Sequence, residues 1–290
     1  MSGNGSVGRM FRVVGIGYVV FAATFVWLGA MGLESGTFTA IWSGVPKAMP
    51  ARVAVTYLTA IVCLVSGLGL LLRSSAAIAS RALLAYWLLW AIAFRIPLLV
   101  REPGSSAVWW VCGETMVMMS GAWVLYAWWC GPNDGRPGAI AAGETGRRIA
   151  RVLYGLGLIP FGIAHFTFLA HTAELVPGWL PGHNGWAYFT GATFIAAGMA
   201  VVSGVLARPA ATLSAWQMGL FTLIVWVPVV LRGANADDWN EFVDSCALTA
   251  AAWVVAESWR ELPESIRASR PGDPKGSRVQ PETTEAAKLS

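Results

Sequence analysis

The stretch VLYGLGLIPFGIAHFTFLAH, residues 152–171, runs for twenty residues without an Asp, Glu, Lys or Arg. As a helix, a run of this length crosses roughly 30 Å of hydrocarbon. Six more apolar runs of similar length occupy residues 13–31, 53–72, 82–100, 108–129, 187–207 and 211–231. A shorter run at 242–256 lies between Trp239 and Trp259, which are suited to the two membrane interfaces. We therefore expect eight transmembrane helices.

The composition supports a membrane protein. Hydrophobic residues make up 56% of the chain and charged residues 12%, with sixteen Trp. A water-soluble domain of ordinary composition contains about twice that charged fraction. The expected partner is therefore a lipid bilayer, and the net charge of +4 does not require a nucleic-acid partner.

The chain also repeats itself. VPKAMPA at Val45 to Ala51 returns as VPGWLPG at Val176 to Gly182, and proline makes such loops rigid and extended. Other matches occur in the same order: Gly15, Gly17 and Phe21 with Gly155, Gly157 and Phe161; residues 57–67 with 194–204; Pro97 and Arg101 with Pro228 and Arg232; Trp109 and Glu114 with Trp239 and Asp244. The first run is thus the counterpart of the fifth, which favours a retained span over a cleaved signal peptide.

Two copies of a four-helix unit follow from this pattern. Four is an even number, so both copies cross the bilayer in the same sense and are parallel repeats. The predicted fold class is an all-α membrane protein with eight transmembrane helices in two four-helix bundles. We expect the first repeat at residues 1–130, a cytoplasmic linker at 131–150, the second repeat at 151–259 and a disordered cytoplasmic tail at 260–290.

Lys and Arg indicate the orientation. With a cytoplasmic amino terminus, fifteen of the twenty basic residues lie inside, four lie outside, and Arg95 falls within a helix. The positive-inside rule therefore predicts both termini in the cytoplasm and both proline loops outside. The expected location is the cell membrane, as a multi-pass protein of the bacterial inner membrane.

Four ionisable residues lie within the expected spans: Arg95, Glu114, His165 and Asp244. A charge inside a bilayer costs several kcal/mol, so such residues mark functional sites by default. All four belong to the outer half. Glu114 and Asp244 are repeat counterparts, whereas Arg95 corresponds to Trp226 and His165 to Phe25.

The simplest pairing joins Arg95 to Glu114 in the first copy and His165 to Asp244 in the second. A carboxylate beside an imidazole fixes its tautomer, which suits a histidine that handles protons or grips a ligand. His165 and Asp244 are therefore the candidate catalytic pair, and Arg95 and Glu114 the candidate ligand-binding pair. The alternative for both is a buried structural bridge that holds helices in register.

Metal and disulfide chemistry have weaker patterns. The histidines His165, His171 and His183 do not share a helical face, so no metal site is predicted. Cys112 and Cys246 both fall near the outer ends of their helices, where they form either a redox-active thiol pair or small packing residues. The sequence does not decide between these uses, nor does it indicate an oligomeric state.

The segment from Gly155 to Gly204 resembles the first two helices of the DoxX-like family of bacterial membrane proteins. The resemblance lies in Gly162 followed by His165 and Phe166, then Val-Pro-x-x-Leu-Pro, then Thr190 and Gly191 opening the second helix. Family members have one four-helix unit, so this chain resembles a fused pair. The resemblance implies a link to membrane redox systems that reduce quinones or assist thiol chemistry.

Two functions from different classes follow. The first is a quinone-linked or thiol-linked membrane redox subunit with a partner protein, in which His165 and Asp244 hydrogen-bond a quinone and exchange a proton with it. The second is a non-enzymatic protein that binds or transports a small amphiphilic ligand, with Arg95 and Glu114 holding its polar head. Whether the protein is an enzyme stays open at this point.

Overall fold

The computed structural model describes residues 15–43, 45–46, 48–130 and 141–260, and within these ranges the chain is helical with no strand. Seven of the described helices are long and apolar enough to cross a membrane. Five of them are α2 (Ile16–Ser35), α3 (Arg52–Leu71), α6 (Ser106–Trp129), α7 (Gly143–Thr167) and α9 (His183–Ser203). The predicted all-helical fold is thus confirmed, and these seven helices are candidate membrane spans by their length and composition.

The other two spans are composite. Helix α4 (Ala76–Trp90) continues through a π-helical turn, η2 (Ala91–Arg95), into α5 (Ile96–Arg101). Helix α10 (Ala207–Phe221) continues through a second π-helical turn, η4 (Thr222–Trp226), into α11 (Val227–Leu231). Pro97 and Pro228 follow the two π turns. A proline ring clashes with the carbonyl four residues earlier in a regular α-helix, and the wider turn relieves that clash.

Helix α12 (Ala236–Glu257) contains the predicted eighth run but is longer and more polar. It begins with a capping box, in which the Asn235 side chain accepts from the backbone of Asp238 and the Asp238 side chain accepts from the backbone of Asn235. Glu241, Asp244 and Glu257 lie further along it. These acids lower its apolarity, and α12 is not one of the seven candidate spans in the described ranges.

Two short helices occupy the loops, η1 (Ala40–Trp42) after α2 and α8 (Leu169–Glu174) after α7. The predicted tail lies almost wholly outside the described residues, as do residues 131–140 of the predicted linker. Helix α7 already begins at Gly143, so the last part of that linker is helical.

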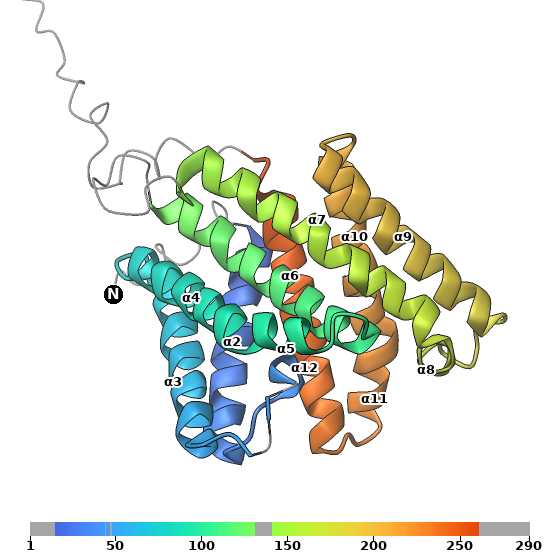
Figure 1. Ribbon diagram of the computed structural model, residues 1–290, viewed down its shortest axis with the longest axis horizontal. Helices are drawn as coiled ribbons and strands as arrows, with labels where there is room; N and C mark the ends of the chain where they lie inside the picture. Colours follow the sequence, from blue (N-terminus) through green and yellow to red (C-terminus); the bar gives the residue numbers. More distant parts are fainter. Residues whose placement is uncertain (1–14, 44, 47, 131–140, 261–290) are drawn as a thin grey trace, which may run out of the picture.

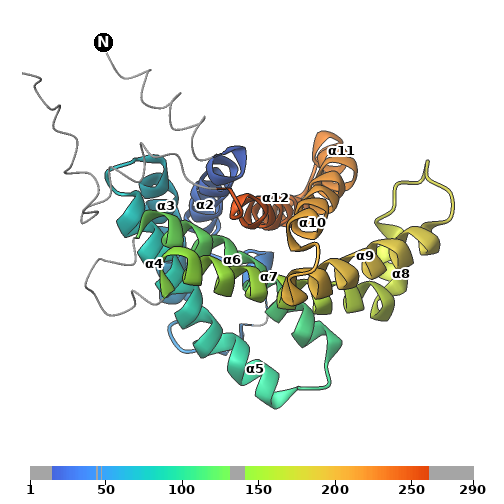
Figure 2. The same ribbon diagram turned by 90° about the horizontal axis from the view of Figure 1, so that it is seen from above.

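The long helices pack in sequence around the molecule: α2 on α3, α3 on α4, α4 on α6, α6 on α7, α7 on α9, α9 on α10, and α10 on α12. Helix α12 then packs back on α2, and α6 and α12 also contact each other (Figures 1 and 2). The two sets of helices are therefore joined rather than separate. The fourth long helix of each set packs on the first helix of the other.

Glycine allows the closest of these contacts. Gly155 of α7 faces Gly198 of α9, and a methyl group added to Gly198 would lie 2.6 Å from the carbonyl oxygen of Gly155. Gly162 of α7 and Gly191 of α9 make a second such contact, about two helical turns away along the same pair of helices. Small residues at a membrane helix interface let two backbones approach closely, and the gain is van der Waals packing. This approach fixes which face of α7 meets α9.

Candidate functional site

The segment between α2 and α3 does not stay outside the helices. Thr39, Ile41 and Trp42 are 3%, 1% and 3% exposed, because η1 turns inward against α6 and α12. The Trp42 ring stacks on Trp87 of α4 with centroids 6.2 Å apart, and its Nε1–H donates to the hydroxyl of Tyr86. We call residues 39–43 the inserted segment. The sequence predicted the loop in general but not its insertion.

Arg95, at the end of η2, is the best-satisfied charge in this region. Its Nε donates to Thr115 Oγ1 at 2.8 Å, its Nη1 to the Ser43 carbonyl at 2.5 Å, and its Nη2 to the Ile41 carbonyl at 3.0 Å. The side chain is buried at 3% exposure. Hydrogen bonds to a charged donor are stronger than neutral ones. Arg95 therefore ties the inserted segment to α6.

Asp244 of α12 meets the same segment from the other side. Its Oδ1 accepts from Thr39 Oγ1 at 3.4 Å, which is a long hydrogen bond. The residue is 5% exposed, and Oδ2 has no hydrogen-bond partner among the described residues. A buried carboxylate oxygen without a partner is costly, and buried polar groups in folded proteins nearly always have one. Asp244 is thus the unusual group in the region.

Glu114 of α6 completes the cluster. It lies within electrostatic range of both Arg95 and Asp244, and Glu241 of α12 acts on both carboxylates. The hydrogen bonds that Arg95 makes to described residues go to Thr115 and to backbone carbonyls rather than to Glu114. Arg95 and Glu114, which the sequence predicted as a pair, are close enough to interact electrostatically, but no hydrogen bond joins them among the described residues. We call Arg95, Glu114 and Asp244 the polar centre.

His165 lies elsewhere, so the predicted pairing of His165 with Asp244 requires correction. The His165 Nδ1 hydrogen-bonds to the carbonyl of Phe161 at 2.9 Å, and its ring lies 5.5 Å from that of Phe194 on α9. The charged groups that act on Asp244 are Glu114 and Glu241. The physical reason is the glycine contact, because His165 sits over Gly191 and faces α9.

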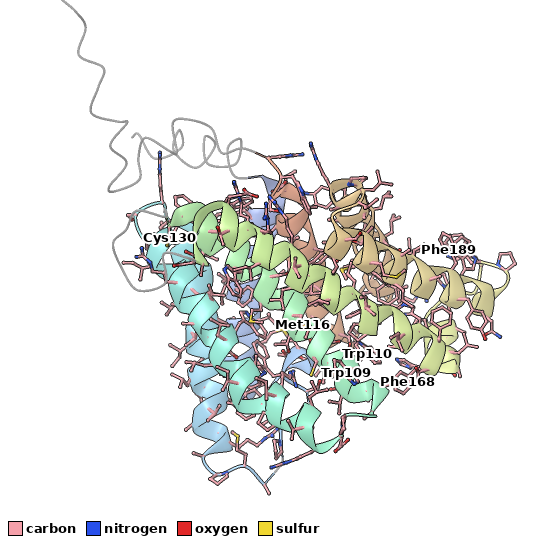
Figure 3. All side chains as sticks on the ribbon, turned by 45° about the horizontal axis from the view of Figure 1, so that its top comes forward. Trp109, Trp110, Met116, Cys130, Phe168 and Phe189 are labelled. Carbon is pink, nitrogen blue, oxygen red and sulfur yellow. The ribbon has the colours of Figure 1, made fainter. Side chains whose placement is uncertain are left out.

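Aromatic rings also pack between α7 and α6. Trp110 of α6 lies 6.3 Å from Phe161 and 5.8 Å from Phe168, which follows the last residue of α7 (Figure 3). This packing occupies the space between α6 and α7. Phe161 also lies 5.6 Å from Phe194 of α9, so its ring contacts both neighbouring helices, whereas His165 packs on α9.

The remaining candidates take no part in a metal or disulfide site. No group of three or more His, Cys, Asp or Glu side chains in the described ranges is arranged to hold a metal ion. Cys112 is buried and Cys246 is half-buried, and both are free thiols. Cys112 lies within electrostatic range of Arg95. It is the cysteine associated with the polar centre.

A small recess opens beside the inserted segment. Its lining comes from α2, α3 and the segment itself: Leu28, Gly32, Thr37, Phe38, Thr39, Trp42, Thr56, Thr59 and Ala60. Thr39 thus borders the recess and donates to Asp244. The recess is small, and its lining is apolar apart from four threonine hydroxyl groups.

Comparison of the chain with protein-family models, with curated proteins and with solved structures finds no match.

Proposed function

We propose that this chain is a DoxX-like multi-pass membrane protein whose polar centre binds a small amphiphilic ligand without chemical turnover. The observation that carries the proposal is the unpartnered Oδ2 of Asp244, buried at the junction of α6, α12 and the inserted segment. A ligand head that hydrogen-bonds this oxygen would supply what the protein leaves unmade.

The architecture we propose is two parallel repeats with α12 as the eighth span. Three features support it. The two composite helices carry the same π turn before the same proline. The helix order within each set is the same, and each fourth helix packs on the first helix of the other set. The last feature is expected of two copies related by an axis along the membrane normal.

The proposed orientation has both termini in the cytoplasm of a bacterial inner membrane, on the basis of the distribution of Lys and Arg. The polar centre then lies in the outer half of the bilayer. A ligand would enter it from the outer leaflet or the outer solution.

Single cysteines test this orientation. Ser43→Cys and Gly185→Cys are expected to react with an impermeant thiol reagent added to intact cells, because both positions are exposed and lie on the proposed outer side. Thr145→Cys is expected to react only after the cells are opened. The unsubstituted protein measures the background of the native thiols. Reaction of Thr145→Cys in intact cells, with protection of the other two, would reverse the orientation.

The ligand is tested by purification in mild detergent and mass spectrometry of the small molecules that co-purify. We expect an amphiphile with the unsubstituted protein and its loss from Asp244→Asn, which removes the acid while nearly preserving shape. The matched control is Glu102→Gln, an exposed acid outside the polar centre. His165→Phe is expected to retain the ligand. Equal recovery from Asp244→Asn and the control would refute the proposal.

A redox subunit linked to quinones or thiols is the second candidate. The observation that favours it is the position of Cys112, a buried free thiol near Arg95 at the polar centre. Such a subunit would receive electrons from a partner protein. Cys112→Ser separates the two functions: it would abolish partner-dependent reduction of an added quinone but leave ligand recovery unchanged.

A further inference from the structure

We propose that Asp244 holds a proton, and that this proton exchanges with the solution by way of Glu241. The inference deepens the proposed function, because a ligand head that meets Asp244 Oδ2 would meet this proton. It rests on that function only for the ligand. The proton itself is measured on the protein without any added ligand.

The charge balance of the polar centre is the first argument. Arg95 is buried and supplies one positive charge. Arg95 and Glu114 act on each other, but Arg95 is not among the charged groups that act on Asp244, so among the described residues the buried Asp244 carboxylate has no cation to balance it. An uncompensated charge in a low-dielectric interior is expensive, and two neighbouring carboxylates disfavour simultaneous ionisation. One bound proton makes the three groups neutral together.

The unmade hydrogen bond of Asp244 is the second argument. The Thr39 hydroxyl donates to Oδ1 of Asp244, whereas Oδ2 has no hydrogen-bond partner among the described residues. The residue is 5% exposed. An ionised carboxylate only accepts hydrogen bonds, but a protonated one also donates. A proton at this oxygen turns an isolated acceptor into a donor toward Glu114 or a bound ligand.

The third argument is the route. Asp237, Glu241 and Asp244 are spaced by four and three residues on α12, so they lie on one face of the helix. Glu241 is exposed and acts electrostatically on Asp244 and Glu114. Asp237 in the first turn acts on Glu241 in turn. Acidic groups therefore lead from the surface end of α12 to the buried pair.

The groups from other elements are few. His171 of α8 acts on Glu241, and Arg95 of η2 acts on Glu114. Helices α2 and α10 also pack on α12. The charged residues within their described bounds are Glu34 in the last turn of α2 and Arg208 in the first turn of α10. Within the described chain, the proton site is thus defined by Arg95, Glu114, Asp244 and Glu241.

Infrared spectroscopy of the purified full chain in detergent tests the proton. At neutral pH we expect the C=O stretch of a protonated carboxyl group, shifted to lower frequency in D₂O. Asp244→Asn should lose it, because Glu114 alone is balanced by Arg95. Glu114→Gln should keep it, because Arg95 is not among the charged groups that act on Asp244. Absence of the band in the unsubstituted protein, or its survival in Asp244→Asn, overturns the proposal.

Matched controls assign the band. Glu257 is a second buried acid with an unpartnered oxygen, Oε2, but unlike Asp244 it has a cation beside it, because its Oε1 lies 3.7 Å from Nη1 of Arg260. Glu257→Gln should therefore keep the band, and so should Glu102→Gln at the exposed end of α5. A band lost in Glu257→Gln and kept in Asp244→Asn would place the proton there and overturn the proposal. So would a band that depends on sodium concentration at fixed pH, which would assign a cation site instead.

The proposed path of proton exchange through Glu241 is tested by a separate variant. This test does not require the variants at buried positions to fold. Glu241 is exposed, so Glu241→Gln should fold like the unsubstituted protein. We expect the band to remain and its exchange on transfer to D₂O to slow. The control is Asp238→Asn, because Asp238 lies in the capping box and is not among the groups that act on Glu241. An unchanged exchange rate in Glu241→Gln overturns the route.

Discussion

Replacement of Arg95 by methionine is expected to lower the stability of the protein by about 3 to 5 kcal/mol. The change removes three hydrogen bonds at once and leaves the carbonyls of Ile41 and Ser43 without that donor. It also removes the cation that acts on Glu114. For a chain of this size the thermal midpoint should fall by roughly 10 °C. The measurement is thermal unfolding in a fixed detergent, followed by loss of the monodisperse peak.

The matched control for this prediction is Arg101→Met, which removes the same charge from an exposed position in the last turn of α5. Its midpoint should stay within about 2 °C, since exposed substitutions change stability by about half a kcal/mol or less. Arg95→Lys should not restore stability, because one ammonium group cannot reproduce the three divergent contacts of the guanidinium. Equal midpoints for Arg95→Met and Arg101→Met would contradict a structural role for Arg95.

Gly198→Ala is expected to destabilise the protein by about 1 to 3 kcal/mol, whereas Gly185→Ala in the same helix should not. The new methyl group at position 198 would lie 2.6 Å from the carbonyl oxygen of Gly155 and 2.9 Å from a side-chain carbon of Ile159. The carbonyl is backbone and cannot move alone, so α7 and α9 must separate. At Gly185 nothing lies within 4 Å, and alanine is the better helix former.

Thermal midpoints of the two variants, measured side by side, decide this prediction. Both substitutions add the same single methyl group to α9, so a general effect of alanine cancels in the comparison. A midpoint for Gly198→Ala equal to or above that of Gly185→Ala would show that the close contact between α7 and α9 is absent.

Much of the fold was predictable because its signal is local. A run such as residues 152–171 must be a helix in a bilayer, because the α-helix is the conformation in which a single segment makes all of its own backbone hydrogen bonds. The π turns were not predicted, although the prolines that accompany them were visible in the matched Ile-Pro and Val-Pro pairs. The eighth run was predicted at residues 242–256, but α12 begins at Ala236 because Asn235 and Asp238 cap it. Capping is a local signal that the apolar run alone does not contain.

The candidate site was less predictable, because it depends on how helices face one another. Arg95, Glu114 and Asp244 could be singled out as ionisable residues in apolar surroundings, and they do gather at one place. The predicted pairing of His165 with Asp244 was wrong because the close contact between Gly162 and Gly191 places His165 against α9. The spacing of residues along the sequence does not show which face of α7 meets which neighbouring helix. Thr39 and the carbonyls of Ile41 and Ser43 carried no signal, since nothing in a loop sequence announces that it folds inward.

The contact between α2 and α12 joins the first and the last described long helices of the chain. During synthesis the face of α2 that receives α12 therefore stays without its protein neighbour until translation is nearly complete. The same holds for the inserted segment, because Thr39 is made about two hundred residues before Asp244, at a sequence separation of 205. Contacts of such separation form late and slowly. In that interval the face of α2 is in contact with something other than α12, so the surroundings of α2 during assembly differ from those in the finished protein.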